Sequence, residues 1–131
     1  MTGNPVARSF PARPEDLYRI REFVREQGRG VAIPGPILDE ITLAVSEACA
    51  NSALHSRSLE VTVRWRAAPD HVEVTVDDEG VFARRVKFPG MNGLEGGRGI
   101  PIMMALMDEI TIREGREHAP GTSVRLVKYA S

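Results

Sequence analysis

The sequence is poor in the features on which small secreted, metal-binding and membrane proteins depend. Its 131 residues include one cysteine, Cys49, so an intramolecular disulfide and a multi-cysteine zinc site are excluded. The three histidines show no metal-ligand spacing. No apolar run approaches the roughly 20 residues that span a bilayer, and the N-terminus lacks the basic and then apolar pattern of a signal peptide. We therefore expect a cytoplasmic protein that does not contact a membrane.

An excess of positive charge is also absent. Seventeen Lys and Arg residues stand against eighteen Asp and Glu, which gives a formal net charge of -1. General nucleic-acid binders need a basic excess to release phosphate counterions, so we expect no direct nucleic-acid partner. Hydrophobic residues make up 42% of the chain and charged residues 27%, as is usual for a folded domain of this length. The sequence therefore predicts a single domain over residues 1–131.

The first part of the chain is predicted to form an edge strand and two helices. The segment 6–10 has the length of a short edge strand. A proline and two acids at 14–16 favour a helix start, and Gly28 and Gly30 are expected to end that helix. A Pro-Gly-Pro turn at 34–36 introduces the second helix. Its apolar residues recur at helical spacing and predict a core-facing stripe made of Leu38, Ile41, Val45, Ala48 and Cys49.

From residue 59 the period changes to alternation, which predicts strands. One face of the first strand consists of Leu59, Val61, Val63 and Trp65. A Pro-Asp turn at 69–70 joins it to a second alternating segment, 72–76, so the two form a β-hairpin. Residues 109–114 and 122–129 are expected to be two final strands. The fold class is α+β: a two-layer α/β sandwich whose mixed, mostly antiparallel sheet has helices on one face.

A long segment separates the hairpin from the final strands. Residues 80–99 contain six glycines and four basic residues, and a loop of this length is uncommon in a compact domain unless it has a function or is disordered. An apolar helix follows over 100–107. We expect its methionines to pack in the core, although methionine also suits adaptable partner surfaces; they are Met103, Met104 and Met107.

Glu47 and Asn51 form the first candidate site. They are four residues apart on the second predicted helix, so they lie one above the other on the same face. A carboxylate can polarise a hydroxyl group, and an amide oxygen can ligate Mg²⁺ without adding charge. His55 extends this polar line by one turn, and small neighbours leave room for a bulky ligand; they are Ala44, Ala48, Ala50 and Ala53. Taken alone, the pair is more typical of a solvated helix face, because polar pairs at this spacing are common on any helix.

Three further segments have the composition of a binding site. The strand 72–76 ends in the acidic turn 77–80, where a carboxylate can accept a hydrogen bond from an exocyclic amine. The glycine cluster 96–99 leads directly into a helix start at Ile100, whose free N–H groups and helix dipole favour a phosphate group. Gly121-Thr122 opens the last strand. Each segment, taken singly, is also typical of an ordinary turn or hinge.

Together and in this order, the four segments resemble the nucleotide-binding motifs of the GHKL superfamily (gyrase, heat-shock chaperone, histidine kinase and mismatch-repair ATPase). They are most similar to its small bacterial branch, the anti-sigma-factor serine/threonine kinases. The resemblance runs from about Phe10 to Lys128. The matching motifs are Glu47-x-x-x-Asn51, Asp78-x-Gly80, Gly97-x-Gly99-Ile100 and Gly121-Thr122.

The resemblance implies a role for each residue that matches. Glu47 would be the general base that activates the attacking hydroxyl. Asn51 would ligate the Mg²⁺ that is bound to the nucleotide phosphates. Asp78 would accept the adenine amino group, Gly80 would let the base approach, and Thr122 would help through its hydroxyl. ATP and Mg²⁺ are therefore the implied cofactors.

The third motif implies a lid over the phosphates, and the second departs from the family pattern. Gly97 and Gly99 would hinge the lid, and the helix from Ile100 would point its N-terminus at the phosphates. Arg98 is our own candidate for a γ-phosphate contact, because it is the one cation inside the glycine cluster. The family's second motif usually continues to another glycine, where this chain has Phe82. A bulky side chain there restricts the backbone where the lid begins.

The resemblance implies a kinase with two protein partners. It would use ATP to phosphorylate a Ser or Thr of a small anti-sigma antagonist protein and would sequester a sigma factor; related kinases commonly form homodimers. Two alternatives remain. One is a non-catalytic ATP-binding regulator that acts only by partner sequestration, which Phe82 leaves open. The other is an α/β domain whose motifs are accidental. Glu47 favours the kinase, because a pure binding module needs no base.

Overall fold

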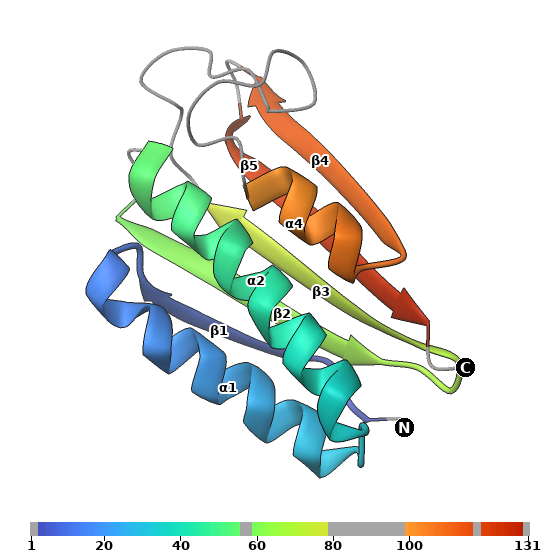
Figure 1. Cartoon of the computed structure of the whole chain (residues 1–131). Helices are drawn as coiled ribbons and strands as arrows, with labels where there is room; N and C mark the ends of the chain where they lie inside the picture. The colour runs from blue at the N-terminus through green and yellow to red at the C-terminus, as the bar shows by residue number, and fades with distance from the viewer. Residues whose placement is uncertain (1–2, 56–58, 79–98, 117–118, 130–131) are drawn as a thin grey trace.

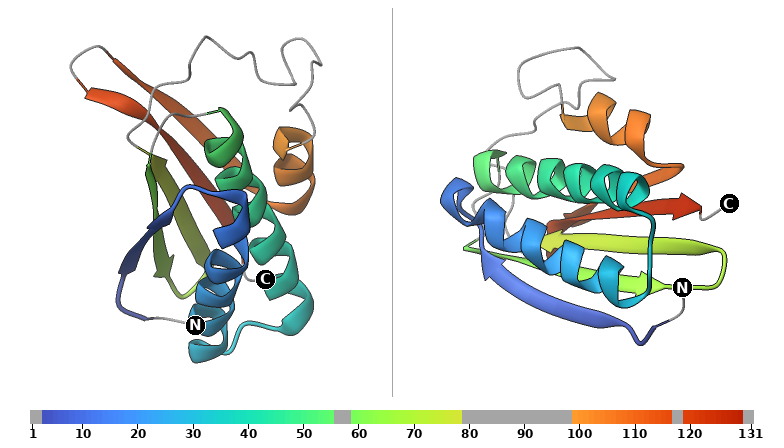
Figure 2. Two further views of the ribbon diagram at one scale, coloured as in Figure 1. Left: turned by 90° about the vertical axis from the view of Figure 1, so that its left-hand side faces the viewer. Right: turned by 60° about the horizontal axis from the view of Figure 1, so that its bottom comes forward.

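The structure is a two-layer sandwich of helices on a sheet. This computed structural model describes residues 3–55, 59–78, 99–116 and 119–129. Within this part of the chain, three α-helices cover one face of a five-stranded sheet (Figures 1 and 2). All of its strand pairs are antiparallel. The predicted α+β sandwich with helices on one face is therefore confirmed.

The strand order brings segments that are distant in sequence together. It is β1-β2-β3-β5-β4, so β1 and β4 form the two edges and β5 lies between β3 and β4. The elements are β1 (Val6–Pro11), a 3₁₀ turn (Pro14–Asp16), α1 (Leu17–Gly30), α2 (Gly35–His55), β2 (Glu60–Ala67), β3 (His71–Asp78), α4 (Gly99–Leu106), β4 (Glu109–Arg116) and β5 (Ala119–Tyr129). The predicted β2–β3 hairpin and both final strands are confirmed.

Helix α1 ends at one of the two glycines expected to end it. The helix runs through Gly28 to Gly30, so the prediction is wrong for Gly28 and confirmed for Gly30. A Cβ atom on Gly28 would lie 2.3 Å from Cδ1 of Leu38, the first stripe residue of α2. Gly28 is thus needed for the close approach of two helices and not as a terminator.

After Gly30, at the C-terminal end of α1, the chain reverses direction in a Schellman motif. The N–H of Ile33 donates to the carbonyl of Gly28 at 3.0 Å, and that of Ala32 donates to the carbonyl of Arg29 at 3.2 Å. This pair of bonds requires a left-handed residue, and Ala32 occupies the position with φ 58°. Glycine is the usual residue there, since an L side chain is strained in that region.

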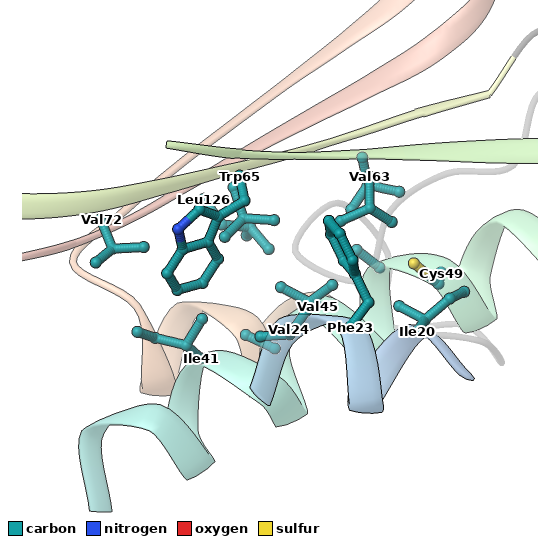
Figure 3. Packing of buried hydrophobic residues seen from close by; sticks show 14 of the residues in the cluster. Ile20, Phe23, Val24, Ile41, Val45, Cys49, Val63, Trp65, Val72 and Leu126 are labelled. Atoms are coloured by element: carbon teal, nitrogen blue, oxygen red, sulfur yellow. The ribbon is translucent and has the colours of Figure 1, made fainter. Parts of the chain in front are cut away.

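The core lies between the helices and the sheet (Figure 3). The predicted α2 stripe is confirmed, because all five of its residues are buried. All five belong to one core cluster with Val63, Trp65, Val72 and Leu126 of the sheet, and Figure 3 shows Ile41, Val45 and Cys49 on the helix side of it. Two expectations fail. Leu59 precedes β2 and is 88% exposed, and Met104 of α4 is 65% exposed while its neighbours Met103 and Met107 are buried.

Helix α4 is anchored at its C-terminal end. Lys128 Nζ on β5 donates to the carbonyl of Leu106 at 2.6 Å and lies 3.6 Å from Oε1 of Glu40 on α2. A cation at a helix C-terminus satisfies a terminal carbonyl and complements the helix dipole. Next to it, the Asp108 N–H donates to the carbonyl of Val127 at 2.8 Å, and the Tyr129 N–H donates to Asp108 Oδ2 at 2.6 Å. The two helices and β5 are thereby joined.

Candidate functional site

A polar cluster interrupts the apolar layer where α2 passes over the ends of β3 and β5. Asp78 is the last residue of β3, and it is directly opposite Thr122 of β5 in the sheet register. Ser52 of α2 donates from Oγ to Asp78 Oδ2 at 2.8 Å. All three residues are at least nine-tenths buried. Burying a polar group lowers the stability of the fold unless the group is hydrogen-bonded, and the bond from Ser52 to Asp78 meets this requirement.

Cys49 lies next to this cluster. Its thiol is buried, and burial together with the negative charge of Asp78 raises the pKa of Cys49 well above its ordinary value. The thiol therefore stays protonated at neutral pH and cannot act as a nucleophile or metal ligand. The expectation of a small buried residue on the core stripe is confirmed.

Glu47 and Asn51 lie on the same helix as Ser52. Both are half-buried, and their spacing places them one turn apart on one face of α2. The room expected from the surrounding alanines is only partly present. Ala44 and Ala48 are fully covered by the core, whereas Ala50 and Ala53 are half-buried. Of these four alanines, only Ala50 and Ala53, in the C-terminal half of the helix, are accessible.

Helix α4 lies beside α2 and begins at Gly99 (Figure 1). The predicted helix start directly behind the glycine cluster is confirmed, and Gly99 and Ile100 form the first turn. The other candidates of the second and third motifs, Gly80, Phe82, Gly97 and Arg98, lie outside the described residues. The structure therefore brings Asp78, Thr122 and the C-terminal half of α2 together, with α4 alongside.

Ser52 is the site residue that the sequence reasoning missed. A signal for it was present, because the stripe residues 38, 41, 45 and 48 follow a spacing of three and four that continues to 52. A hydroxyl on an otherwise apolar stripe requires a buried partner. The partner had to be polar and at the facing end of a strand, as Asp78 is.

Comparison with known proteins then identifies the fold and family. Residues 10–128 match the family of histidine kinase-like ATPase domains. The chain belongs to this family. The resemblance to GHKL proteins is thereby confirmed, and the idea that the motifs are accidental is wrong.

Relatives of this ATPase-family chain include serine-protein kinases. The serine-protein kinase RsbW of Bacillus subtilis (strain 168) is 30% identical, over 95% of this chain and 84% of the relative. RsbW of Bacillus licheniformis is also 30% identical, over 91% of this chain and 81% of the relative.

Solved structures of the family have the same fold. The RsbU and RsbW domains of Rv1364c from Mycobacterium tuberculosis align with a TM-score of 0.71 at 19% identity, over 96% of this chain and 32% of that one. The histidine kinase domain of the blue-light activated histidine kinase EL346 from Erythrobacter litoralis aligns with a TM-score of 0.59 at 23% identity, over 92% and 62%. At such identities the likeness concerns the fold alone. Among the described helices of this chain, none is both long and apolar enough to cross a membrane.

Proposed function

We propose that this chain is an ATP-binding anti-sigma regulatory protein and a protein serine/threonine kinase, with residues 1–131 acting as one domain. Its substrate would be a small anti-sigma antagonist protein, and it would also sequester a sigma factor. The observation that carries the proposal is the position of Glu47 and Asn51 on the helix that covers the buried Ser52–Asp78 pair. The 30% identity to a serine-protein kinase over 95% of the chain supports the same activity.

The buried cluster suits recognition of an adenine amino group. A carboxylate offers about four lone-pair positions, and Ser52 uses one of those on Asp78. This bond fixes the orientation of the carboxylate, so Asp78 is held ready to accept the exocyclic amine. Thr122 contributes a hydroxyl from the neighbouring strand, directly opposite Asp78. Gly80 would let the base approach the turn.

The C-terminal half of α2 suits the phosphates. The half-buried amide of Asn51 offers an oxygen ligand of the hard, neutral kind that Mg²⁺ accepts beside phosphate oxygens. When bound, Mg²⁺ would neutralise phosphate charge. The first turn of α4, from Gly99 and Ile100, would offer its N–H groups and the positive end of the helix dipole to the phosphates. Gly97 would hinge the lid, and Arg98 would contact the γ-phosphate.

Glu47 supplies the base for phosphoryl transfer. Its carboxylate would take the proton of the substrate hydroxyl as the hydroxyl oxygen bonds to the γ-phosphorus of ATP. The bond to the bridging oxygen breaks in the same step, and ADP leaves with the electron pair. Phosphoryl transfer depends mostly on positioning and charge neutralisation, so one base, one amide ligand and a set of N–H donors suffice.

The nucleotide part of the proposal is tested by calorimetry of Mg-ATP binding. Asn51→Ala removes the magnesium ligand and should reduce the affinity for Mg-ATP below detection. The matched control is Asn4→Ala, which changes an exposed amide at the N-terminal end of the chain. Equal affinity in wild type and Asn51→Ala would remove Asn51 from the site.

A non-catalytic regulator is the second candidate, favoured by Phe82 in place of the family's usual glycine. The discriminating experiment is capture of partners from the native cell with and without ATP, followed by incubation of the captured material with γ-labelled ATP. A phosphoserine or phosphothreonine on a captured antagonist establishes the kinase. Retention of partners with no label transferred establishes sequestration alone.

A further inference from the structure

A lysine occupies a core-facing position near the end of β5. Lys128 is directly opposite Val72 in the sheet register, so its side chain belongs to the face that the helices cover. The preceding residues of β5 on that face, Val124 and Leu126, are apolar and buried. Only 16% of the Lys128 side chain is exposed. Lysine is rarely covered to this extent unless its ammonium group has partners, so its contacts indicate what a charge does at this position.

The ammonium group of Lys128 contacts two helices at once. Nζ donates to the main-chain carbonyl of Leu106, the last residue of α4, at 2.6 Å and lies 3.6 Å from Glu40 Oε1 on α2. A hydrogen bond from a charged donor is shorter and stronger than one between neutral groups. The ion pair adds little to stability, because Glu40 is 41% exposed and water screens the charges. What the two contacts do together is hold the C-terminal end of α4 at one place along α2.

Glu40 lies on the face of α2 that carries the candidate phosphate-end residues. Glu47 and Asn51 follow it by seven and eleven positions, which is close to two and three helical turns. All three residues therefore share one face of the helix, and all three are half-buried. Helix α4 lies beside α2 in both figures that show the whole chain (Figures 1 and 2). Lys128 thus ties α4 to the helix that bears Glu47 and Asn51.

The opposite end of α4 is the one that we assign to the phosphates. Its first turn contains Gly99 and Ile100. The hydrogen bonds of an α-helix link each turn to the next, so a helix of eight residues keeps its two ends in a fixed relation. The contact at Leu106 therefore also determines where the N–H groups of this first turn stand relative to Asn51.

The adenine end of the candidate site lies outside this linkage. Asp78 and Thr122 are placed by the pairing of β3 with β5, and Ser52 is bonded directly to Asp78. Lys128 is six positions beyond Thr122 on β5, and six residues of a strand span about 20 Å. The ammonium group is therefore too distant to contact a base held by Asp78.

We propose that Lys128 is a positioning residue for the phosphate end of the nucleotide site. By holding the carbonyl of Leu106 beside Glu40, it keeps the first turn of α4 where the phosphates require it. This role rests on the proposed function as an ATP-binding protein. Lys128 itself contacts no nucleotide and acts through α4, so recognition of adenine does not depend on it.

Binding of two ligands to Lys128→Met tests this role. Methionine keeps an unbranched side chain and removes the charge. Loss of a charged hydrogen bond should lower the affinity for Mg-ATP by about tenfold, measured by calorimetry. Adenosine, which has the base without the phosphates, should bind as it does to the wild type. Arg125→Met is the matched control, because Arg125 lies on the same strand but pairs with Glu73 and Glu109; its affinity for Mg-ATP should be unchanged.

Glu40→Gln tests the α2 side of the linkage at a half-exposed position. It removes the ion pair but leaves the bond to Leu106, so the loss of Mg-ATP affinity should be smaller than in Lys128→Met. The double variant should lose no more than Lys128→Met alone, because both changes break the same linkage. Thermal melting checks the fold of each variant, and Glu40→Gln decides alone if Lys128→Met does not fold.

Two results would overturn the role of Lys128. One is wild-type affinity for Mg-ATP in Lys128→Met, or in Glu40→Gln if that variant decides. The other is an equal loss of affinity for Mg-ATP and adenosine, which is expected if Lys128 only stabilises the fold. Either result leaves ATP binding by the wild type intact. A wild type that binds neither ligand would instead overturn the proposed function, and the positioning role with it.

Discussion

The two halves of α2 serve different purposes. The N-terminal half packs Leu38, Ile41 and Val45 into the core and against α1, with Gly28 allowing the close approach. The C-terminal half carries Ser52 inside the protein, together with the polar groups that we assign to nucleotide chemistry. The packed first half of α2 thus holds the polar residues of its second half in place, because both belong to one continuous helix. Substitutions should accordingly separate stability, in the first half, from ligand chemistry, in the second.

The largest expected effect is that of Glu47→Ala. Removal of a general base typically lowers the rate of transfer by about 10²- to 10⁴-fold, while Mg-ATP binding should be kept because Asn51 and Asp78 are unchanged. The rate is measured as label transferred from γ-labelled ATP to the antagonist protein. Glu26→Ala, an exposed acid on α1, is the control. A Glu47→Ala variant with wild-type transfer would show that the second half of α2 does not supply the base.

Gly28→Ala should produce the largest loss of stability. The new Cβ would lie 2.3 Å from Cδ1 and 3.1 Å from Cγ of the buried Leu38, so either this side chain must leave its packed position or α1 and α2 must move apart. Overpacking of this kind costs about 2 kcal/mol, measured as the free energy of unfolding in urea. Gly30→Ala is the matched control, because nothing lies within 4 Å of its Cβ position and alanine is the better helix former. Equal stability of the two variants would show that α1 and α2 do not need this close contact.

Ser52→Ala tests whether one residue of α2 contributes both to stability and to ATP binding. It leaves the buried Asp78 without the hydroxyl donor, which should lower the free energy of unfolding by about 1 kcal/mol and weaken ATP binding as well. Ser46 is its counterpart on the same helix, with a 3.2 Å hydrogen bond from Arg21 Nη1. Ser46→Ala should affect stability alone. ATP affinity that is unchanged in Ser52→Ala, by calorimetry, would separate Ser52 from the nucleotide site.

Ala32→Gly should give the smallest effect and the opposite sign. Ala32 has φ 58° in the Schellman motif behind α1, and glycine adopts this region without strain. The free energy of unfolding should rise by about 0.5–1 kcal/mol, seen as a higher melting temperature with no change in ATP affinity. A lower melting temperature would mean that the methyl group of Ala32 contributes packing that outweighs the strain.

Local periodicity explains what could be predicted from the sequence. The α2 stripe and the alternation of Val61, Val63 and Trp65 are repeated patterns, and each was confirmed by burial. Gly28 and Ala32 were not foreseen in their roles, because the close contact of two helices and the left-handed position depend on tertiary structure and override simple propensity. The strand order that sets Asp78 beside Thr122 likewise arises only when separate hairpins meet.

The residues of the candidate site also include some that the sequence predicts and one that it does not. Asp78 and Asn51 were predicted from motifs, whereas Ser52 required knowledge of which strand end faces the helix. The exposure of Met104 could not be predicted either. An apolar helix with several methionines gives no strong indication of which side remains uncovered, and here the uncovered side adjoins an edge strand.

The attachment of α4 by Lys128 determines how that helix can tilt. Its C-terminal end is held by Leu106, Asp108 and their bonds to β5, so any rotation has its pivot there. A helix of eight residues is about 12 Å long, and a tilt of about 10° about that pivot displaces the backbone at Gly99 by about 2 Å. The three hydrogen bonds to β5 at Leu106 and Asp108 thus form the pivot of the helix.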